Sequence, residues 1–376
     1  MSNPPQRSDN VQRLAAYLQN HPEPKLAVFD IGTRANRLLV GPKQPPADNW
    51  GRDLFFNAGE VTNLGQVVNR YSPLVEADNA GLREVVDFIR QFRDLLDRAG
   101  LSPAAIIATG TAVFRWIENQ DEVLRIIQDR AGVDLRILDG EKEAFFSLEA
   151  VYATYKFRQR AEWSGDLSEN DAILLLDQGG GSTEISCLSP TREGFMMKFQ
   201  SFDQLGTTAL RDRFFTTGKD GRIDPAANRN RVSTQNQRIR GHIRDEIEKW
   251  GAYPELAGKH ILPYAMGSAV TECFKCNSYS LHNRCLTVDR MLEISDQRCS
   301  EIDNSTQWVS TLHGELAATP GFKTNNLDGV LTQLYGLPVY RGFLEKLGLD
   351  HLFLCGYGLR YGVYSHVCIY HQPLPG

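Results

Sequence analysis

The feature that most constrains this chain is a glycine-rich turn at residues 177–184, which follows the apolar run 173–176. Glycines let successive backbone N–H groups approach one anion, and hydroxyl side chains add further donors. Asp177 and Glu184 flank the turn, and both are suited to hold a magnesium ion. A plain glycine hairpin turn would not explain these two acids, so the pattern favours a phosphate-binding loop. The residues expected to bind phosphate here are Gly179, Gly180, Gly181, Ser182 and Thr183.

Two further glycine turns follow apolar segments elsewhere in the chain. The first comes after residues 26–30 and contains Asp30 at the strand end, and the last follows residues 260–265. A second expected strand, residues 37–41, completes the first hairpin, as residues 184–188 complete the one described above. The repetition predicts two related halves, and three turns after three strands predict one shared cleft. The additional phosphate-binding candidates are Gly32, Thr33, Arg34, Gly267 and Ser268.

Strand and helix patterns alternate along the chain, which predicts an α/β protein. Helical spacing of apolar residues at 79–100 precedes a short strand at 104–109, and a helix at 119–130 precedes a strand at 135–138. The expected organisation is a polar N-terminal segment at 1–24, a first domain at 25–142, a second domain at 143–355, and a C-terminal helix within 356–376 that returns to the first domain.

Composition narrows the class of protein. The 376 residues, 41% of them hydrophobic, suffice for two cores. No apolar run approaches the roughly 20 residues that span a bilayer, so we expect no membrane insertion. The polar N-terminus lacks the pattern of a signal peptide, and an odd count of 7 cysteines suits a reducing compartment. These features predict a cytoplasmic protein.

The cysteines between residues 273 and 299 allow a zinc site as an alternative to ordinary reduced thiols. Their spacings match no zinc ribbon, so reduced and partly buried cysteines are the favoured interpretation. The residues concerned are Cys273, Cys276, Cys285 and Cys299, with His282 and His313 nearby.

A net charge of −5 argues against a broad nucleic-acid surface, yet arginines are concentrated between residues 211 and 244. Such a run is typical of a solvated helix face, but as the wall of a groove it would also suit a polyanion. Both interpretations stay open at this point. The arginines are Arg211, Arg213, Arg222, Arg229, Arg231, Arg238, Arg240 and Arg244.

Phosphoryl transfer needs donors, a metal and an oriented nucleophile, and the chain offers candidates for each. Arg115, just after the strand at 104–109, is suited to bidentate phosphate binding, and Arg34 adds charge to the first turn. Asp30 would assist Asp177 in holding the metal. Glu143, in the first turn of an expected helix, is a candidate base for water, although acids there also simply complement the helix dipole.

Taken together, these motifs resemble the exopolyphosphatase/guanosine pentaphosphate phosphohydrolase (Ppx/GppA) family over roughly residues 25–365. The resemblance implies two actin-like, ribonuclease H-like domains flanking a cleft, as in the actin/sugar-kinase/heat-shock ATPase superfamily. It also implies Mg²⁺-dependent hydrolysis of terminal phosphoanhydride bonds. The matching segments are residues 28–33, 108–119, 137–144, 177–184, 205–206 and 266–268.

By this resemblance Glu143 is the general base, Arg115 a phosphate clamp, and Asp177 with Glu184 the metal-binding pair, assisted by Asp30. Three positions depart from the family pattern. Residues 33–35 read Thr-Arg-Ala where Ser-Asn-Ser is usual, Gln178 replaces an aliphatic residue, and Val270 replaces a glycine.

The chain resembles the short, two-domain members of the family. The expected activity is release of orthophosphate from inorganic polyphosphate, and the close alternative is guanosine pentaphosphate 5′-phosphohydrolase. A catalytically weak sensor of polyphosphate or nucleotide is a third interpretation, and a sugar or acetate kinase of the same superfamily is a fourth. A homodimer is the default expectation for the oligomeric state.

Overall fold

The computed structural model of the chain separates into two compact units, which are described one at a time. Unit 1 comprises Met1–Asp166 and Leu359–Gly376, and unit 2 comprises Leu167–Gly358. The structure describes residues 4–33, 35–45, 54–62, 64–68, 73–157, 167–215, 232–251, 253–271, 273, 284–304 and 327–368.

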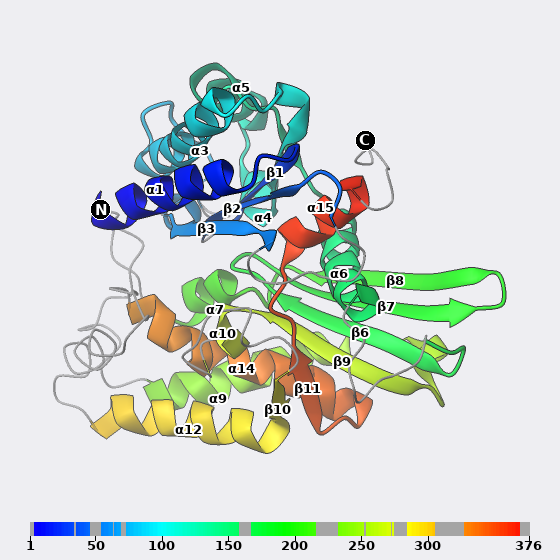
Figure 1. Cartoon of the computed structure of the whole chain (residues 1–376). Coiled ribbons are helices and arrows are strands. Elements are labelled where there is room, and N and C mark those ends of the chain that lie inside the picture. The colour runs from blue at the N-terminus through cyan, green and yellow to red at the C-terminus, as the bar shows by residue number, and fades with distance from the viewer. Residues whose placement is uncertain are drawn as a thin grey trace. The chain divides into compact units, whose positions relative to one another are not determined.

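Unit 1 contains a five-stranded sheet of order β3-β2-β1-β4-β5 (Figure 1). The antiparallel part is β1, β2 and β3, whereas β4 runs parallel to β1 and β5 parallel to β4. The strands are β1 (Lys25–Ile31), β2 (Ala35–Pro42), β3 (Phe56–Val61), β4 (Ile106–Gly110) and β5 (Leu135–Ile137).

Helices cover both faces of this sheet. The apolar stripe of α3 packs with Phe29 and Leu38 in the core of unit 1, and α15 contacts β1 from the opposite face (Figure 1). Asn79 caps α3 by accepting hydrogen bonds from two backbone N–H groups of its first turn. The helices are α1 (Pro4–Asn20), α2 (Leu64–Val67), α3 (Ala80–Arg98), α4 (Ala112–Trp116), α5 (Gln120–Ala131), α6 (Gly140–Phe157) and α15 (Leu359–Cys368).

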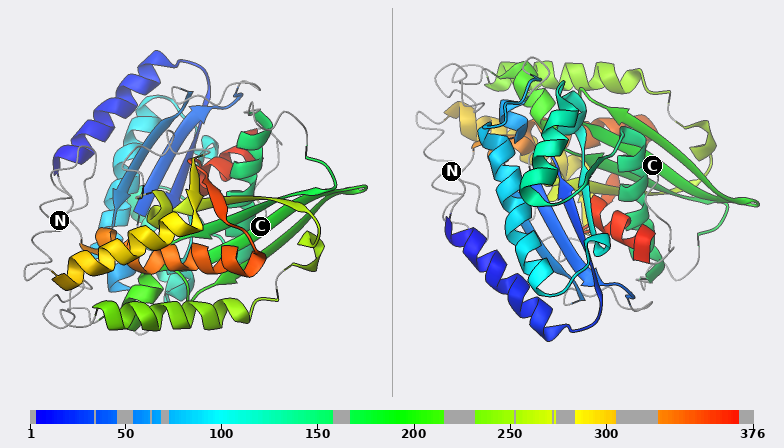
Figure 2. Two further views of the ribbon diagram at one scale, coloured as in Figure 1. Left: turned by 90° about the horizontal axis from the view of Figure 1, so that it is seen from below. Right: turned by 90° about the horizontal axis from the view of Figure 1, so that it is seen from above.

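Unit 2 contains a six-stranded sheet of order β10-β11-β9-β6-β7-β8. Its centre repeats unit 1, because β6 pairs antiparallel with β7 and parallel with β9. Figure 2 shows β7 and β8 as a long hairpin. The strands are β6 (Asp171–Gln178), β7 (Thr183–Thr191), β8 (Gly194–Phe202), β9 (His260–Gly267), β10 (Cys285–Thr287) and β11 (His351–Leu354).

One face of the second sheet packs on a layer of helices. Leu174, Leu176 and Ile185 point into this core, where they meet Tyr335 and Phe343 of α14. Figure 2 shows α9, α14 and α12 side by side. The helices are α7 (Thr207–Phe214), α9 (Val232–Glu248), α10 (Ser268–Thr271), α12 (Val288–Asn304) and α14 (Leu327–Leu347).

The architecture confirms the predicted fold class, an α/β protein with two mixed sheets built on the actin-like, ribonuclease H-like strand order. The division between units differs from the expected boundary at 142/143, because α6 packs extensively against α15 and so belongs to unit 1. The expected polar segment 1–24 is largely helical, as α1. Among the described helices, none is both long and apolar enough to cross a membrane.

Candidate active site

The glycine-rich turn of unit 2 joins β6 to β7 and is braced by the start of α7. The turn closes on itself, since the Gly179 N–H donates to the Ser182 carbonyl at 2.9 Å. Thr207 N–H then donates to the Gly179 carbonyl at 3.0 Å, and Thr208 N–H to the Gly180 carbonyl at 2.7 Å. Because these carbonyl groups are engaged by α7, the conformation of the turn is fixed by backbone contacts.

Gly206 makes this close packing possible. A Cβ atom at this position would lie 2.3 Å from the Gly181 carbonyl carbon and 2.4 Å from the Ser182 nitrogen, so no other residue fits. Its backbone angles, φ −66° and ψ 150°, are ordinary, and the requirement is therefore one of space. Ser182 is 1% exposed, and its hydroxyl oxygen has no hydrogen-bond partner among the described residues. A buried hydroxyl in such a turn suits an anionic ligand.

Asp177 and Glu184 lie directly opposite each other on β6 and β7. Their side chains share one face of the sheet, because residues paired across strands point the same way. Glu184 is 1% exposed and accepts a hydrogen bond of 2.9 Å from the Ser201 hydroxyl. Among the described residues no group of three metal-binding side chains is present. Two adjacent carboxylates nevertheless fit Mg²⁺, which commonly takes one or two carboxylates and completes its shell with water or phosphate oxygens.

Gln178 and Thr183, the neighbours of these acids, point to the opposite face. The Gln178 Nε2 and the Thr183 Oγ1 both donate to the Leu205 carbonyl, at 3.0 and 2.8 Å. They therefore hold the segment that places Gly206 against the turn. In the sequence Gln178 stands out only as a departure from the family pattern, whereas in the structure its amide fixes the Leu205 carbonyl.

The third glycine turn, at Gly267, is constrained from two sides. Gly267 has φ +121°, and a Cβ there would lie 2.5 Å from the Gln178 carbonyl oxygen. The Tyr340 hydroxyl donates to the Met266 carbonyl at 2.6 Å, and burial, with the charge of Asp177, raises the pKa of Tyr340 well above its usual range. Tyr340 therefore remains a donor. Ser268 begins the short α10, and Val270 packs into the core of unit 2.

The first glycine turn lies in unit 1, between β1 and β2. Gly32 N–H donates to the Ala35 carbonyl at 3.0 Å, which closes the turn. Gly65 N–H donates to the Thr33 carbonyl at 3.0 Å, and a Cβ on Gly65 would lie 2.2 Å from that oxygen. The turn is thus supported by α2. Arg34 falls outside the described residues.

Asp30, at the end of β1, lies beside Arg37 and is influenced by the charge of Arg360. It is 4% exposed, and the Arg37 Nη1 is 3.8 Å from its Oδ2. Burial raises the pKa of Asp30, while the charges of Arg37 and Arg360 oppose that shift. Arg360 is held by Asn57, whose Oδ1 accepts from Nε at 3.0 Å. The Arg37 guanidinium already lies beside this carboxylate. The expected metal-binding role of Asp30 stays a prediction.

Arg115 and Glu143 meet in unit 1. The Arg115 Nη1 donates to the Glu143 Oε2 at 2.9 Å and to the Leu138 carbonyl at 2.7 Å. Asp139 caps α6, since its Oδ1 accepts from the Lys142 N–H at 2.8 Å, and this places Glu143 in the first helical turn. Glu143 is 8% exposed. Burial beside an arginine distinguishes it from an acid that only complements the helix dipole.

The structure thus gathers the predicted residues into two sets. Unit 1 holds the first turn, Arg115 and Glu143, and unit 2 holds the other two turns with both carboxylates. No sequence pattern predicted a site role for Arg37, Arg360 or Gly206. The hairpin register could have revealed Arg37, which pairs with Asp30 across the strands, but Arg360 carries no local signal. Of the proposed zinc ligands, Cys276, His282 and His313 lie outside the described residues.

Comparison with known proteins identifies the family of the chain. The model of the Ppx/GppA phosphatase family matches residues 55–371. The chain therefore belongs to this family, whose members are phosphatases. The resemblance inferred from the motifs is confirmed.

Two curated relatives were found. The uncharacterized protein SCO0757 of Streptomyces coelicolor is 27% identical over 346 residues, which cover 90% of this chain and 89% of that protein. A bifunctional 3-dehydroquinate synthase/phosphatase of Fusobacterium nucleatum is 24% identical over 195 residues, which cover 51% of this chain. That match spans only 27% of the length of the bifunctional protein.

Solved structures show the same fold. A Ppx/GppA family member of Aquifex aeolicus aligns with a TM-score of 0.65 and 19% identity, covering 93% of this chain and 99% of its own. An exopolyphosphatase of Cytophaga hutchinsonii aligns with a TM-score of 0.61 and 18% identity, covering 92% and 98%.

Proposed function

We propose that this protein is an exopolyphosphatase, which hydrolyses the terminal phosphoanhydride bond of inorganic polyphosphate and releases orthophosphate. The observation that carries the proposal is the Arg115–Glu143 ion pair, in which a partly exposed anion-binding group contacts a buried carboxylate. Similarity to the Cytophaga hutchinsonii exopolyphosphatase, and membership of a phosphatase family, support the same reaction class.

In the proposed reaction Glu143 accepts a proton from water as the water oxygen bonds to the terminal phosphorus. The bridging P–O bond breaks, and its electrons stay on the shortened chain, which leaves as a phosphate anion. Among the described residues, Arg115 uses only Nη1 for its contacts, so its other N–H groups are available to a phosphate oxygen. Movement of Arg115 toward phosphate would also release the carboxylate of Glu143.

In the proposed function, unit 2 supplies groups that bind phosphate and Mg²⁺. The backbone N–H groups of the glycine-rich turn and the buried Ser182 hydroxyl would bind phosphate oxygens. Asp177 and Glu184 would hold Mg²⁺, which, when bound, neutralises charge on the phosphate groups.

The experiment is orthophosphate release by the purified protein with magnesium. Polyphosphates of several lengths, guanosine pentaphosphate and ATP are compared, with Glu143→Gln as the inactive variant and Glu141→Gln as its control. Glu141 is an exposed acid in the same helical turn. Release from polyphosphate that is lost only in Glu143→Gln supports the proposal. Preference for guanosine pentaphosphate would support the alternative phosphohydrolase, and tight binding without release would indicate a sensor.

A further inference from the structure

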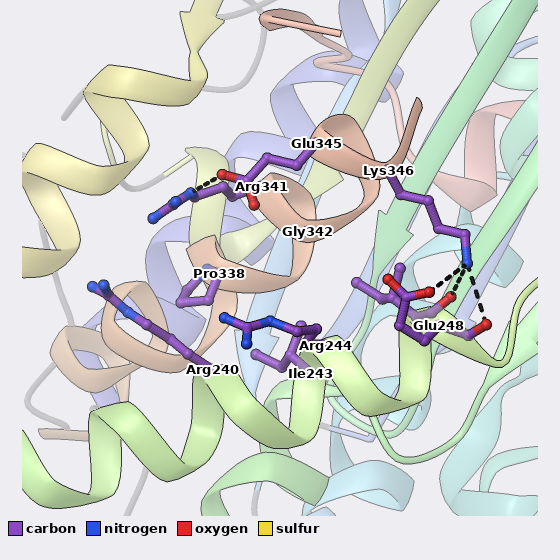
Figure 3. A pocket seen from close by; sticks show the side chains of 10 residues that line it. Arg240, Ile243, Arg244, Glu248, Pro338, Arg341, Gly342, Glu345 and Lys346 are labelled. Atoms are coloured by element: carbon purple, nitrogen blue, oxygen red, sulfur yellow. Dashed lines mark hydrogen bonds and ion pairs between the residues drawn. The ribbon is translucent and has the colours of Figure 1, made fainter. Parts of the chain in front are cut away.

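The arginine-rich stretch of the sequence has no part in the proposed hydrolysis, yet two of its members line a cavity. Arg240 and Arg244 lie one turn apart on α9, and Arg341 faces them from α14. The cavity between the two helices has a volume of about 370 Å³. Figure 3 shows the three arginine side chains around Pro338. We propose that this groove, called the α9–α14 groove, is a second anion-binding site for a compact oligophosphate.

The walls of the groove are fixed by close helix packing. A Cβ on Gly342 of α14 would lie 2.6 Å from the Ile247 Cδ1 and 3.5 Å from the Ile243 Cγ2 of α9. Both isoleucines are almost fully buried in the core of unit 2. The arginines therefore project from two helices that are packed against each other, so little ordering of the backbone is needed to bind a ligand.

Charge in the groove is unbalanced toward positive. Arg240 Nη2 pairs with Asp296 at 2.5 Å, and Arg341 Nε pairs with Glu345 at 2.6 Å. Arg244 has no ion-pair or hydrogen-bond partner among the described residues. Of the three guanidinium groups, two are therefore paired with a carboxylate and the third, on Arg244, is not. In addition, the Arg240 Nε is buried without a hydrogen-bond partner in the described part of the chain.

Two further charged residues, Lys346 and Glu248, lie at the other end of the groove and form an ion pair with each other. Lys346 donates to the Ile247 carbonyl at 2.8 Å and lies 3.7 Å from the Glu248 carboxylate (Figure 3). The surplus positive charge is therefore located at the arginine end.

The groove is separate from the glycine-rich turns. Gly336 and Tyr340 of α14 contact Gln178 and Met266, next to those turns. Pro338, Arg341 and Glu345, which line the groove, are spaced three and four residues apart. With 3.6 residues per turn, the groove-lining residues lie on the face of α14 opposite to Gly336 and Tyr340. A ligand in the groove would not touch the residues assigned to hydrolysis, so this proposal does not rest on the proposed function.

The geometry favours an oligophosphate over a single small anion. One guanidinium group satisfies an isolated phosphate by a forked contact, whereas three groups on two helices suit an anion with several charged centres. The volume corresponds to on the order of ten water molecules, which is sufficient for a chain of a few phosphates.

The test is calorimetric titration with tripolyphosphate at low ionic strength, in EDTA to prevent hydrolysis. The groove variant is Arg240→Gln with Arg244→Gln. The control is Arg90→Gln with Arg290→Gln, because these exposed arginines form comparable ion pairs elsewhere, with Asp87 and Glu293. We expect one binding event to weaken tenfold or more in the groove variant and to persist in the control. Orthophosphate release, measured separately with magnesium, should be the same in the groove variant and in the control.

Arg244→Gln alone guards against a folding defect, since no described residue depends on Arg244 for an ion pair. It should weaken the same event by roughly threefold to tenfold. The proposal is overturned if the groove variant binds tripolyphosphate with the stoichiometry and Kd of the control, or if the unmodified protein does not bind it.

Discussion

Arg115 lies 2.9 Å from Glu143, so the arginine assigned to phosphate and the carboxylate assigned to water are ion-pair partners within unit 1. The pair is also anchored to the backbone, because the same Nη1 donates to the Leu138 carbonyl. In the proposed reaction this arrangement would link phosphate binding to proton transfer, since a phosphate that attracts Arg115 changes the surroundings of Glu143.

Glu143→Gln should lower polyphosphate hydrolysis by roughly two orders of magnitude or more, as expected when a positioned base is lost. Binding should be preserved, because an amide of the same shape still accepts from Arg115. Steady-state rates and a direct binding titration measure the two effects, and Glu141→Gln is the matched control. Turnover unchanged in Glu143→Gln would remove this residue from the mechanism.

Asp177→Asn should raise the magnesium concentration needed for half-maximal activity by roughly tenfold, since one of two carboxylates is lost. Asp171→Asn is the control, because Asp171 begins the same strand at its other end. The measurement is activity against magnesium concentration. Equal requirements in the two variants would argue against metal binding by Asp177.

Gly206→Ala should reduce kcat/KM at least tenfold, because the new methyl group would displace Gly181 and Ser182. The accompanying loss of stability should be about 1–3 kcal/mol, the usual cost of overpacking. Gly241→Ala is the control, since a Cβ there meets nothing within 4 Å and alanine favours the helix. Wild-type activity in Gly206→Ala would show that the turn tolerates movement.

Gln178→Leu and Thr183→Val should each have a modest effect on stability, because the Leu205 carbonyl keeps one of its two donors. The double variant removes both donors and leaves a buried carbonyl unpaired. We expect it to exceed the sum of the single effects by about 1 kcal/mol. Chemical denaturation of the four proteins measures this coupling, and strict additivity would contradict it.

Asp30→Asn should change how stability depends on pH. The pKa of Asp30 is raised above its ordinary value of 3.8, so the folded protein binds this proton more tightly than the unfolded chain. Its stabilising contribution is fully present below pH 3.8 and is lost as pH rises through the folded pKa. The Tm of the unmodified protein should therefore fall relative to Asp30→Asn as pH increases. Asp129→Asn, at an exposed position on α5, is the matched control for removal of one carboxylate.

Much of the fold was predictable because its signals are local. An apolar run followed by a glycine turn gives the strand ends at Asp30, Asp177 and Gly267, and capping by Asp139 fixes the position of Glu143. These features depend on residues within a few positions of each other.

Other features depend on contacts that sequence spacing does not encode. Strand β8 has no buried alternating face, and Phe195 and Met197 are exposed, so it is extended because it pairs with β7 and not because one of its faces packs into the core. The fit of Gly206 against Gly181 arises only once α7 is packed. Likewise the Arg360 charge that acts on Asp30 comes from α15, far along the chain, and it is packing against α15 that places α6 in unit 1.

The return of the chain to unit 1 has a consequence for synthesis on the ribosome. Gly362 of α15 packs so closely on α6 that a Cβ would overlap the Phe146 carbonyl, yet α15 is made only after the whole of Leu167–Gly358. During translation α6 cannot pack on α15 until α15 has been made. Unit 2, whose residues are contiguous, already has its complete sequence by then. The second half of the molecule is therefore free to fold first, and the emergence of α15 from the ribosome is the step that allows the first to be completed.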